Sequence, residues 1–171
     1  MAMSIEVRTI GTETAQKVVA GAVEHATALG IAVCVAVVDR SGHLVAFLRM
    51  DGSPLLSTRL AEDKAYTAVS FGLPTDRWWD VIREEPALVH SLPATDRFVA
   101  FGGGVPIEDA GQVVGAVGVS GGTVAQDAAV AEGAVKAVRR RRAAAARKAP
   151  TARKATAARN ATTGRQRAAT R

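Results

Sequence analysis

The stretch that decides the fold is IAVCVAVVDRSGHLVAFLRM, residues 31–50. Its first part is a short apolar run rich in β-branched valine, which predicts a buried strand rather than a helix. The segment DRSG, residues 39–42, has the composition of a turn, and HLVAFLRM after it predicts a second strand. We therefore expect residues 31–50 to form an antiparallel hairpin.

Helices are predicted on both sides of this hairpin. Before it, residues 12–29 place apolar side chains at helical spacing, and Gly30 follows as a natural terminus. After it, Ser53 and Pro54 supply a cap residue followed by a proline suited to the first helical position. The second helix is expected to start there and to run to about Phe71.

The second half of the body repeats the pairing of strands. FVAFGGGVPIED and QVVGAVGVSGG predict two strands joined at residues 109–111, with short helices before them from Thr75 and a last helix from Thr123. Hairpins in place of alternating strand–helix units favour an α+β domain. We expect an antiparallel sheet of about four to five strands, flanked by helices.

Charge separates the body from the C-terminal segment. The chain has a net charge of +6, yet 12 of its 22 Lys and Arg residues and none of its 16 Asp and Glu residues lie in 139–171. This segment has no large apolar residue, so we expect a domain at 1–138 and a disordered tail at 139–171 whose first turns can extend the last helix. A tail of this charge suits salt-dependent, non-specific binding of nucleic acid, and a merely solubilising tail is the alternative.

Other features limit the function classes. Cys34 is the single cysteine, so no disulfide can form within the chain, and its apolar surroundings predict a buried thiol. The three histidines lack metal-site spacing, and we expect no metal site. No secretory signal or membrane-length apolar run is present, which favours a cytoplasmic protein.

Three glycine-rich or charged corners are candidates for ligand binding. RMDG, residues 49–52, ends the second strand, and the next helix carries Asp63 and Lys64. The glycines of 102–104 are expected where the backbone bends or lets another group approach, and residues 120–122 offer N–H groups to an anion before a helix. The alternatives are a surface ion pair, a solvated helix face and ordinary turns. The GxSxG match at residues 118–122 is no hydrolase elbow, since no histidine follows it.

Taken together, VVDRSGHLVAFLRMDG, DKAYTA, GGGVPI and GAVGVSGG resemble the GlcG/HbpS family over about residues 5–138. The resemblance implies an α+β fold that assembles into dimers and higher oligomers. It also implies a ligand-binding function near a subunit interface, with haem the best-known ligand. The basic tail lies outside the family pattern.

The resemblance further implies that these corners line one pocket. Arg49 and Lys64 would supply positive charge to haem propionates or to a small organic acid, and Asp51 or Asp63 would balance it. No residue is marked as an axial iron ligand, and Met50 is expected in the core. A second hypothesis is an enzyme that acts on a small oxygenated acid by proton transfer, with Lys64 or Asp63 as its base. The full expected binding set is Arg49, Asp51, Lys64, Gly102, Gly103, Gly104, Ser120, Gly121 and Gly122.

Overall fold

The sheet is built around two central strands that lie far apart in the sequence. The structure, a computed structural model, describes residues 3–148. The chain divides into two compact units, Met1–Arg139 and Arg140–Arg171, and the sheet belongs to the first. In chain order the elements are α1 (Thr12–Ala28), β1 (Cys34–Asp39), β2 (Leu44–Arg49), α2 (Ser57–Phe71), η1 (Thr75–Arg77), α3 (Trp78–Ile82), α4 (Pro86–Ser91), η2 (Leu92–Ala94), β3 (Gly104–Asp109), β4 (Gln112–Ser120) and α5 (Val124–Lys148).

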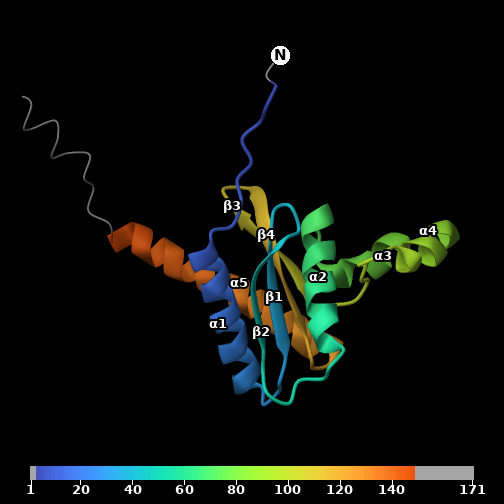
Figure 1. Ribbon diagram of the computed structural model, residues 1–171, viewed down its shortest axis with the longest axis horizontal. Coiled ribbons are helices and arrows are strands. Elements are labelled where there is room, and N and C mark those ends of the chain that lie inside the picture. Colours follow the sequence, from blue (N-terminus) through green and yellow to red (C-terminus); the bar gives the residue numbers. More distant parts are fainter. Residues whose placement is uncertain (1–2, 149–171) are drawn as a thin grey trace, which may run out of the picture. The chain divides into compact units, whose positions relative to one another are not determined.

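The predicted α+β fold and both predicted hairpins are confirmed. The four strands form one antiparallel sheet in the order β2-β1-β4-β3. Cys34 at the start of β1 lies opposite both Arg49 of β2 and Ser120 of β4. The last residues of β2 and β4, where two of the predicted corners begin, therefore lie at the same end of the sheet (Figure 1).

The two faces of the sheet are covered by different helices. Val33, Val35 and Val37 point to one face and join a core with residues of α1 and α5. The alternate residues of β1 point to the other face, where they meet alanines and a valine of α2. Figure 1 shows α1 and α2 on opposite sides of the sheet. The all-apolar run of β1 thus reflects a strand that is buried on both faces.

Helix α2 lies very close to the sheet because glycines face it. A Cβ atom on Gly118 would lie 1.9 Å from the carbonyl oxygen of Ala61, and one on Gly104 would lie 2.4 Å from that of Lys64. Both distances are far below van der Waals contact. Gly104 thus allows the close approach of backbone that was one expectation for residues 102–104, and Gly118 allows the same.

The start of α2 differs from the prediction. The helix begins at Ser57, not at the Ser53-Pro54 pair. The Ser53 hydroxyl makes tertiary contacts instead: its oxygen lies 3.4 Å from the thiol of Cys34 and accepts a hydrogen bond from Arg49. Ser53, which was predicted to cap the helix, thus contacts Cys34 and Arg49 instead.

Two short helices project from the body (Figure 1). Trp78 is buried and makes edge-to-face contacts with Phe71 and Phe98. Its neighbour Trp79 is 55% exposed, as expected for adjacent residues that cannot face one core. No residue of α4 is buried.

Helix α5 continues to Lys148, into the segment whose composition predicts disorder. Alanine, arginine and lysine all favour the helical state, which accounts for the extension. The remainder of the predicted tail, residues 149–171, lies outside the described residues. Within residues 3–148, no helix is long and apolar enough to cross a membrane.

Replacing Gly118 by alanine should destabilise the fold, because the added methyl group would overlap the α2 backbone. We expect Gly118→Ala to lower the free energy of unfolding by at least about 1–3 kcal/mol, as overpacked sites do. The matched control is Gly21→Ala in α1, where the nearest atom would lie 3.7 Å away. Urea denaturation should show the control unchanged or stabilised; equal losses in both variants would contradict the close-approach argument.

Candidate functional site

Lys64 occupies the centre of the predicted site, but it is fully enclosed. Its side chain has no exposed surface, and its ammonium group donates to Asp127 Oδ2 at 2.8 Å and to the carbonyl oxygen of Val119 at 2.9 Å. The same group lies 4.7 Å from the centre of the Phe101 ring. These interactions join α2, β4 and α5 at one point.

The glycine corners close around this ion pair. Asp127 accepts a second hydrogen bond through Oδ1 from the backbone N–H of Gly122, at 2.9 Å. A Cβ atom on Gly103 would lie 2.8 Å from the Lys64 ammonium nitrogen. Lys64, Gly103 and Gly122 lie together, and their own atoms fill the space between them.

The environment of Lys64 disfavours its charge. Burial lowers the pKa of the Lys64 ammonium group, and the hydrogen bond and the charge of Asp127 offset part of this effect. A ligand could reach the group only if the residues that enclose it moved. A proton-transfer role for Lys64 therefore stays a prediction that requires the pair to open.

Asp63, the other predicted base, is held by two arginines. Its carboxylate accepts from Arg59 Nε at 2.9 Å and from Arg97 Nε at 3.1 Å. Arg97 also stacks on the ring of Tyr66 at 3.9 Å, and Arg59 bonds Asp96. The arrangement anchors the segment before β3 to α2. Proton transfer by Asp63 likewise stays a prediction.

Arg49 lies in a different setting, at the exposed end of β2. Its guanidinium group donates to the hydroxyl and the carbonyl oxygens of Ser53, at 3.3 Å each. These acceptors are neutral, and within the described residues no carboxylate lies in ion-pair distance of Arg49. Asp51 is exposed in the turn that follows. Arg49 thus presents a positive charge that the surrounding residues leave uncompensated.

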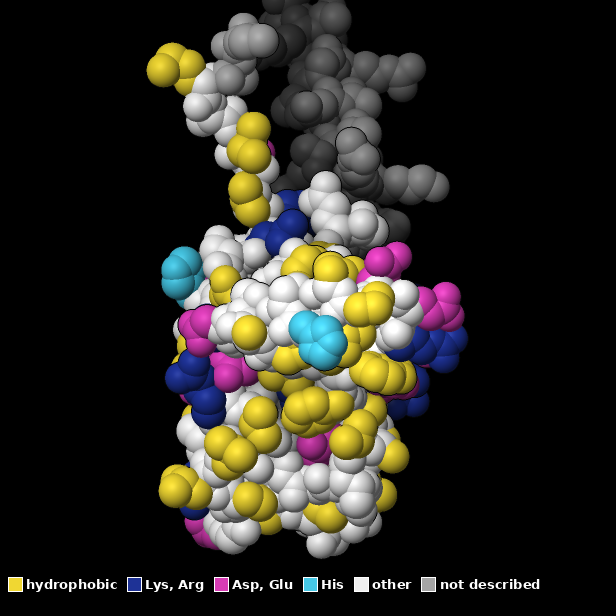
Figure 2. Space-filling view, turned by 90° about the vertical axis from the view of Figure 1, so that its right-hand side faces the viewer, with side chains coloured by type: hydrophobic (Ala, Val, Ile, Leu, Met, Phe, Trp, Pro, Cys, Tyr) yellow, Lys and Arg dark blue, Asp and Glu magenta, His cyan; other side chains and the backbone are white. Residues whose placement is uncertain are grey.

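Exposed apolar side chains accompany Arg49. Phe47 lies on the same face of β2, since it pairs with Ala36 as Arg49 pairs with Cys34. It is 36% exposed, and Leu55 and Leu56, in the loop that Arg49 holds through Ser53, are 80% and 68% exposed. Figure 2 shows hydrophobic side chains gathered around the end of the molecule at which α2 begins. We call Phe47, Arg49, Leu55 and Leu56 the Arg49 surface.

The structure therefore divides the predicted binding set into two groups. Lys64 and several of the glycines belong to the closed ion-pair cluster, whereas Arg49 and Asp51 lie at the surface. The sequence reasoning did not identify Phe47, Leu55 and Leu56. The adjacent leucines before a helix were the available signal, because such positions are usually polar.

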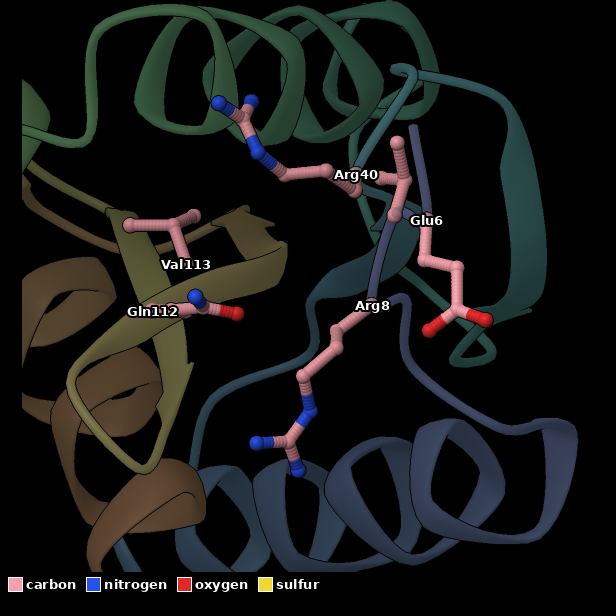
Figure 3. A pocket seen from close by; sticks show the side chains of 6 residues that line it. Glu6, Arg8, Arg40, Gln112 and Val113 are labelled. Carbon is pink, nitrogen blue, oxygen red and sulfur yellow. The ribbon is translucent and has the colours of Figure 1, made fainter. Parts of the chain in front are cut away.

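An open hollow of about 340 Å³ lies elsewhere, between the N-terminal segment and the start of β4. Arg8 and Arg40 both line it, but Figure 3 shows their guanidinium groups directed away from each other. Arg8 bonds Asp109, and Arg40 donates to the carbonyl oxygen of Val69. The hollow contains no residue of the predicted set. The described residues also hold no group of three or more His, Cys, Asp or Glu that could bind a metal ion.

Comparison with known proteins gives a consistent result. Residues 10–136 match the model of the family described as haem degrading protein HbpS-like. A 15.0 kDa uncharacterized protein of Citrobacter freundii, from the dhaT-dhaS intergenic region, is 36% identical over 74% of this chain and 90% of its own length. The corrinoid adenosyltransferase PduO of Salmonella typhimurium is 38% identical over 62% of this chain, which spans about a third (32%) of that enzyme. Among solved structures, the PduOC:haem complex has a TM-score of 0.69 and 32% identity, covering 75% of this chain and 94% of its own.

Removing the Lys64 amine should destabilise the protein strongly, because Asp127 would remain buried without its partner. We expect Lys64→Met to lower the free energy of unfolding by about 3–5 kcal/mol, measured by urea denaturation. The double variant Lys64→Met, Asp127→Asn should recover part of that loss, because the asparagine oxygen can still accept from Gly122. Lys136→Met is the control, since Lys136 forms an exposed pair with Glu132. If both lysine variants lose the same stability, the buried pair does not hold the elements together.

Proposed function

The chain belongs to the HbpS-like family of haem degrading proteins, and we propose that it binds a tetrapyrrole, with haem as the leading candidate, on the Arg49 surface. The observation that supports a tetrapyrrole is the likeness to PduOC, a protein solved in complex with haem. The observation that supports this surface is the uncompensated charge of Arg49 among exposed apolar side chains.

The residues of the Arg49 surface suit the outer parts of a haem molecule. A porphyrin is a flat apolar ring with two carboxylate groups on one edge, so it needs apolar side chains beside a cationic donor. Phe47, Leu55 and Leu56 offer the apolar side chains, and Arg49 can donate charge-assisted hydrogen bonds to a propionate. Haem would supply iron-centred chemistry once bound.

This surface does not by itself supply an iron ligand. Met50 points away from it and packs against the core on the other face, as predicted. Cys34 is buried with its thiol near the hydroxyl groups of Ser53 and Thr58. The chain's own contribution is therefore to bind and orient the ring edge, and we assign no axial ligand.

Titration with haemin tests the proposal. We expect a saturable Soret band in the wild-type protein and a roughly two- to fivefold weaker Kd in Arg49→Ala, the loss typical of an exposed ion pair. Replacing both Leu55 and Leu56 by serine should weaken binding further, because the serines offer the ring much less apolar surface to bury.

The matched control is Arg83→Ala, since Arg83 is an equally long, exposed arginine on the C-terminal side of α3, paired with Asp80. It should leave the Kd of haemin unchanged. An absent spectral change, or equal effects of the Arg49 and Arg83 variants, would refute binding at the Arg49 surface.

We propose non-specific binding of nucleic acid by the basic segment as a second function. The supporting observation is its charge: residues 139–171 hold 12 Lys and Arg residues and no acid. Helix α5 presents the first of these as a helical run, Arg139 to Lys148. Backbone phosphates are the natural partners of such a run.

Salt dependence distinguishes this binding from incidental adhesion. We expect the full chain to bind a duplex of mixed sequence, with log K falling linearly as log[salt] rises. Replacing Arg140, Arg141 and Arg142 by glutamine should reduce the slope by about 1 for each phosphate group that the variant no longer neutralises. Lys17→Gln on α1 is the control and should leave the slope unchanged. Affinity that is independent of salt in every variant would exclude the proposal.

A further inference from the structure

The guanidinium group of Arg49 is held along one edge by a single residue, Ser53. Its Nε donates to the Ser53 hydroxyl oxygen and its Nη2 donates to the Ser53 carbonyl oxygen, at 3.3 Å each. Both bonds leave from the edge of the planar group that Nε and Nη2 share. Two bonds from one edge to one residue fix the position of the guanidinium group and also its plane.

Ser53 is a firm anchor because the fold holds it from several sides. It is 4% exposed, and its hydroxyl oxygen lies 3.4 Å from the thiol of the buried Cys34. Its backbone N–H donates to the carbonyl oxygen of Met50 at 3.2 Å, which closes a turn over residues 50–53. Gly52 in this turn has a φ of 81°, and a positive φ at the third residue of a β-turn favours glycine. The turn therefore places the serine beside an arginine four residues earlier in the chain.

The second edge of the guanidinium group, between Nη1 and Nη2, is left for a ligand. Arginine carries five N–H donors in a rigid, planar arrangement, and the two bonds to Ser53 use only one edge of it. Within residues 3–148, Nη1 of Arg49 has no hydrogen-bond partner. The Nη1–Nη2 edge offers two parallel N–H bonds, which match the two oxygens of a carboxylate.

We propose that Ser53 is the positioning residue of the Arg49 surface and that it makes Arg49 selective for a carboxylate. This inference rests on the proposed function, because the carboxylate is a propionate of the bound tetrapyrrole. A free arginine side chain loses rotamer freedom when it binds a ligand, and Ser53 has already removed part of that freedom. The anchored group also presents a fork of fixed direction, which the point charge of a lysine would not supply.

Haemin and its dimethyl ester separate the carboxylates from the rest of the ligand. The ester keeps the iron and the apolar ring but has no charged oxygen. We expect the wild-type protein to bind the ester roughly two- to fivefold more weakly than haemin, the same loss as for haemin in Arg49→Ala. The ester should bind the wild type and Arg49→Ala with equal Kd, because it has no charge for the guanidinium group to pair with.

Substitutions of Ser53 test whether it acts through the arginine. Ser53→Ala removes the hydroxyl that holds Nε, and we expect it to weaken haemin binding about twofold or more, but no more than Arg49→Ala does. In a chain that already carries Arg49→Ala, the same substitution should have no further effect. Ser53→Thr retains the hydroxyl and should restore the wild-type Kd. A merely structural role would weaken binding in both backgrounds, and binding of the ester as well.

The order of the guanidinium group can be measured by NMR without any ligand. We expect the Nε–H of Arg49 to show a high order parameter and slow hydrogen exchange, and Ser53→Ala to lower the first and to speed up the second. Arg83 is the matched control, because its charged contacts with Asp80 and Glu84 are longer, at 3.6 Å and 3.8 Å. Its Nε–H should be mobile in both proteins. This measurement decides the matter even if the Ser53→Thr chain fails to fold.

Three outcomes would overturn the positioning role of Ser53. They are an Arg49 Nε–H as mobile as that of Arg83, a haemin Kd that Ser53→Ala leaves unchanged, and an equal effect of Ser53→Ala with and without Arg49. Equal affinity of the wild type for haemin and its ester would overturn the selectivity for a carboxylate. If haemin gives no spectral change with the wild type, the proposed function fails and this inference fails with it. If haemin binds and any of the other outcomes is found, the inference alone fails.

Discussion

The buried ion pair between Lys64 and Asp127 is the interaction on which the arrangement of the helices depends. Moving an ammonium and a carboxylate out of water is costly, and the cost is offset only when both groups are fully hydrogen-bonded. Here the lysine meets Asp127 and the carbonyl oxygen of Val119, and the aspartate also accepts from Gly122. The pair therefore requires α2, the end of β4 and the start of α5 to hold one relative position.

This constraint changes the meaning of the glycine-rich corners. Gly103 leaves room for the lysine amine, and Gly104 and Gly118 let the α2 backbone approach the sheet. Glycines and charges that resemble a ligand pocket in the sequence thus build the interface between a helix and a sheet. What remains for a ligand is the end of β2 and the loop after it, where Arg49, Phe47 and two leucines stay exposed. Ligand binding is therefore proposed for the end of β2 and the loop that follows it.

The sequence predicted the local structure well where local patterns determine it. The valine-rich run of 31–39, the turns of both hairpins and the spacing of residues 12–29 each specify their element without outside help. The start of α2 was predicted wrongly: Ser53 has the composition of a cap residue, but in the fold its hydroxyl interacts with Arg49 and Cys34. The binding set stays a prediction, and the structure separates its members, because a charged residue near glycine has the same local pattern whether it faces solvent or a buried partner.

The sequence by itself determined the fold class and the family, because alternation, turn composition and the quoted motifs are properties of neighbouring residues. Only the tertiary structure decided that Lys64 is matched by Asp127, 63 residues further along the chain, and that Arg49 has no acid beside it among the described residues. The physical reason is that the free energy of a charge depends on its burial and on the groups around it. Residues distant in the sequence provide those groups, and only the folded chain brings them together.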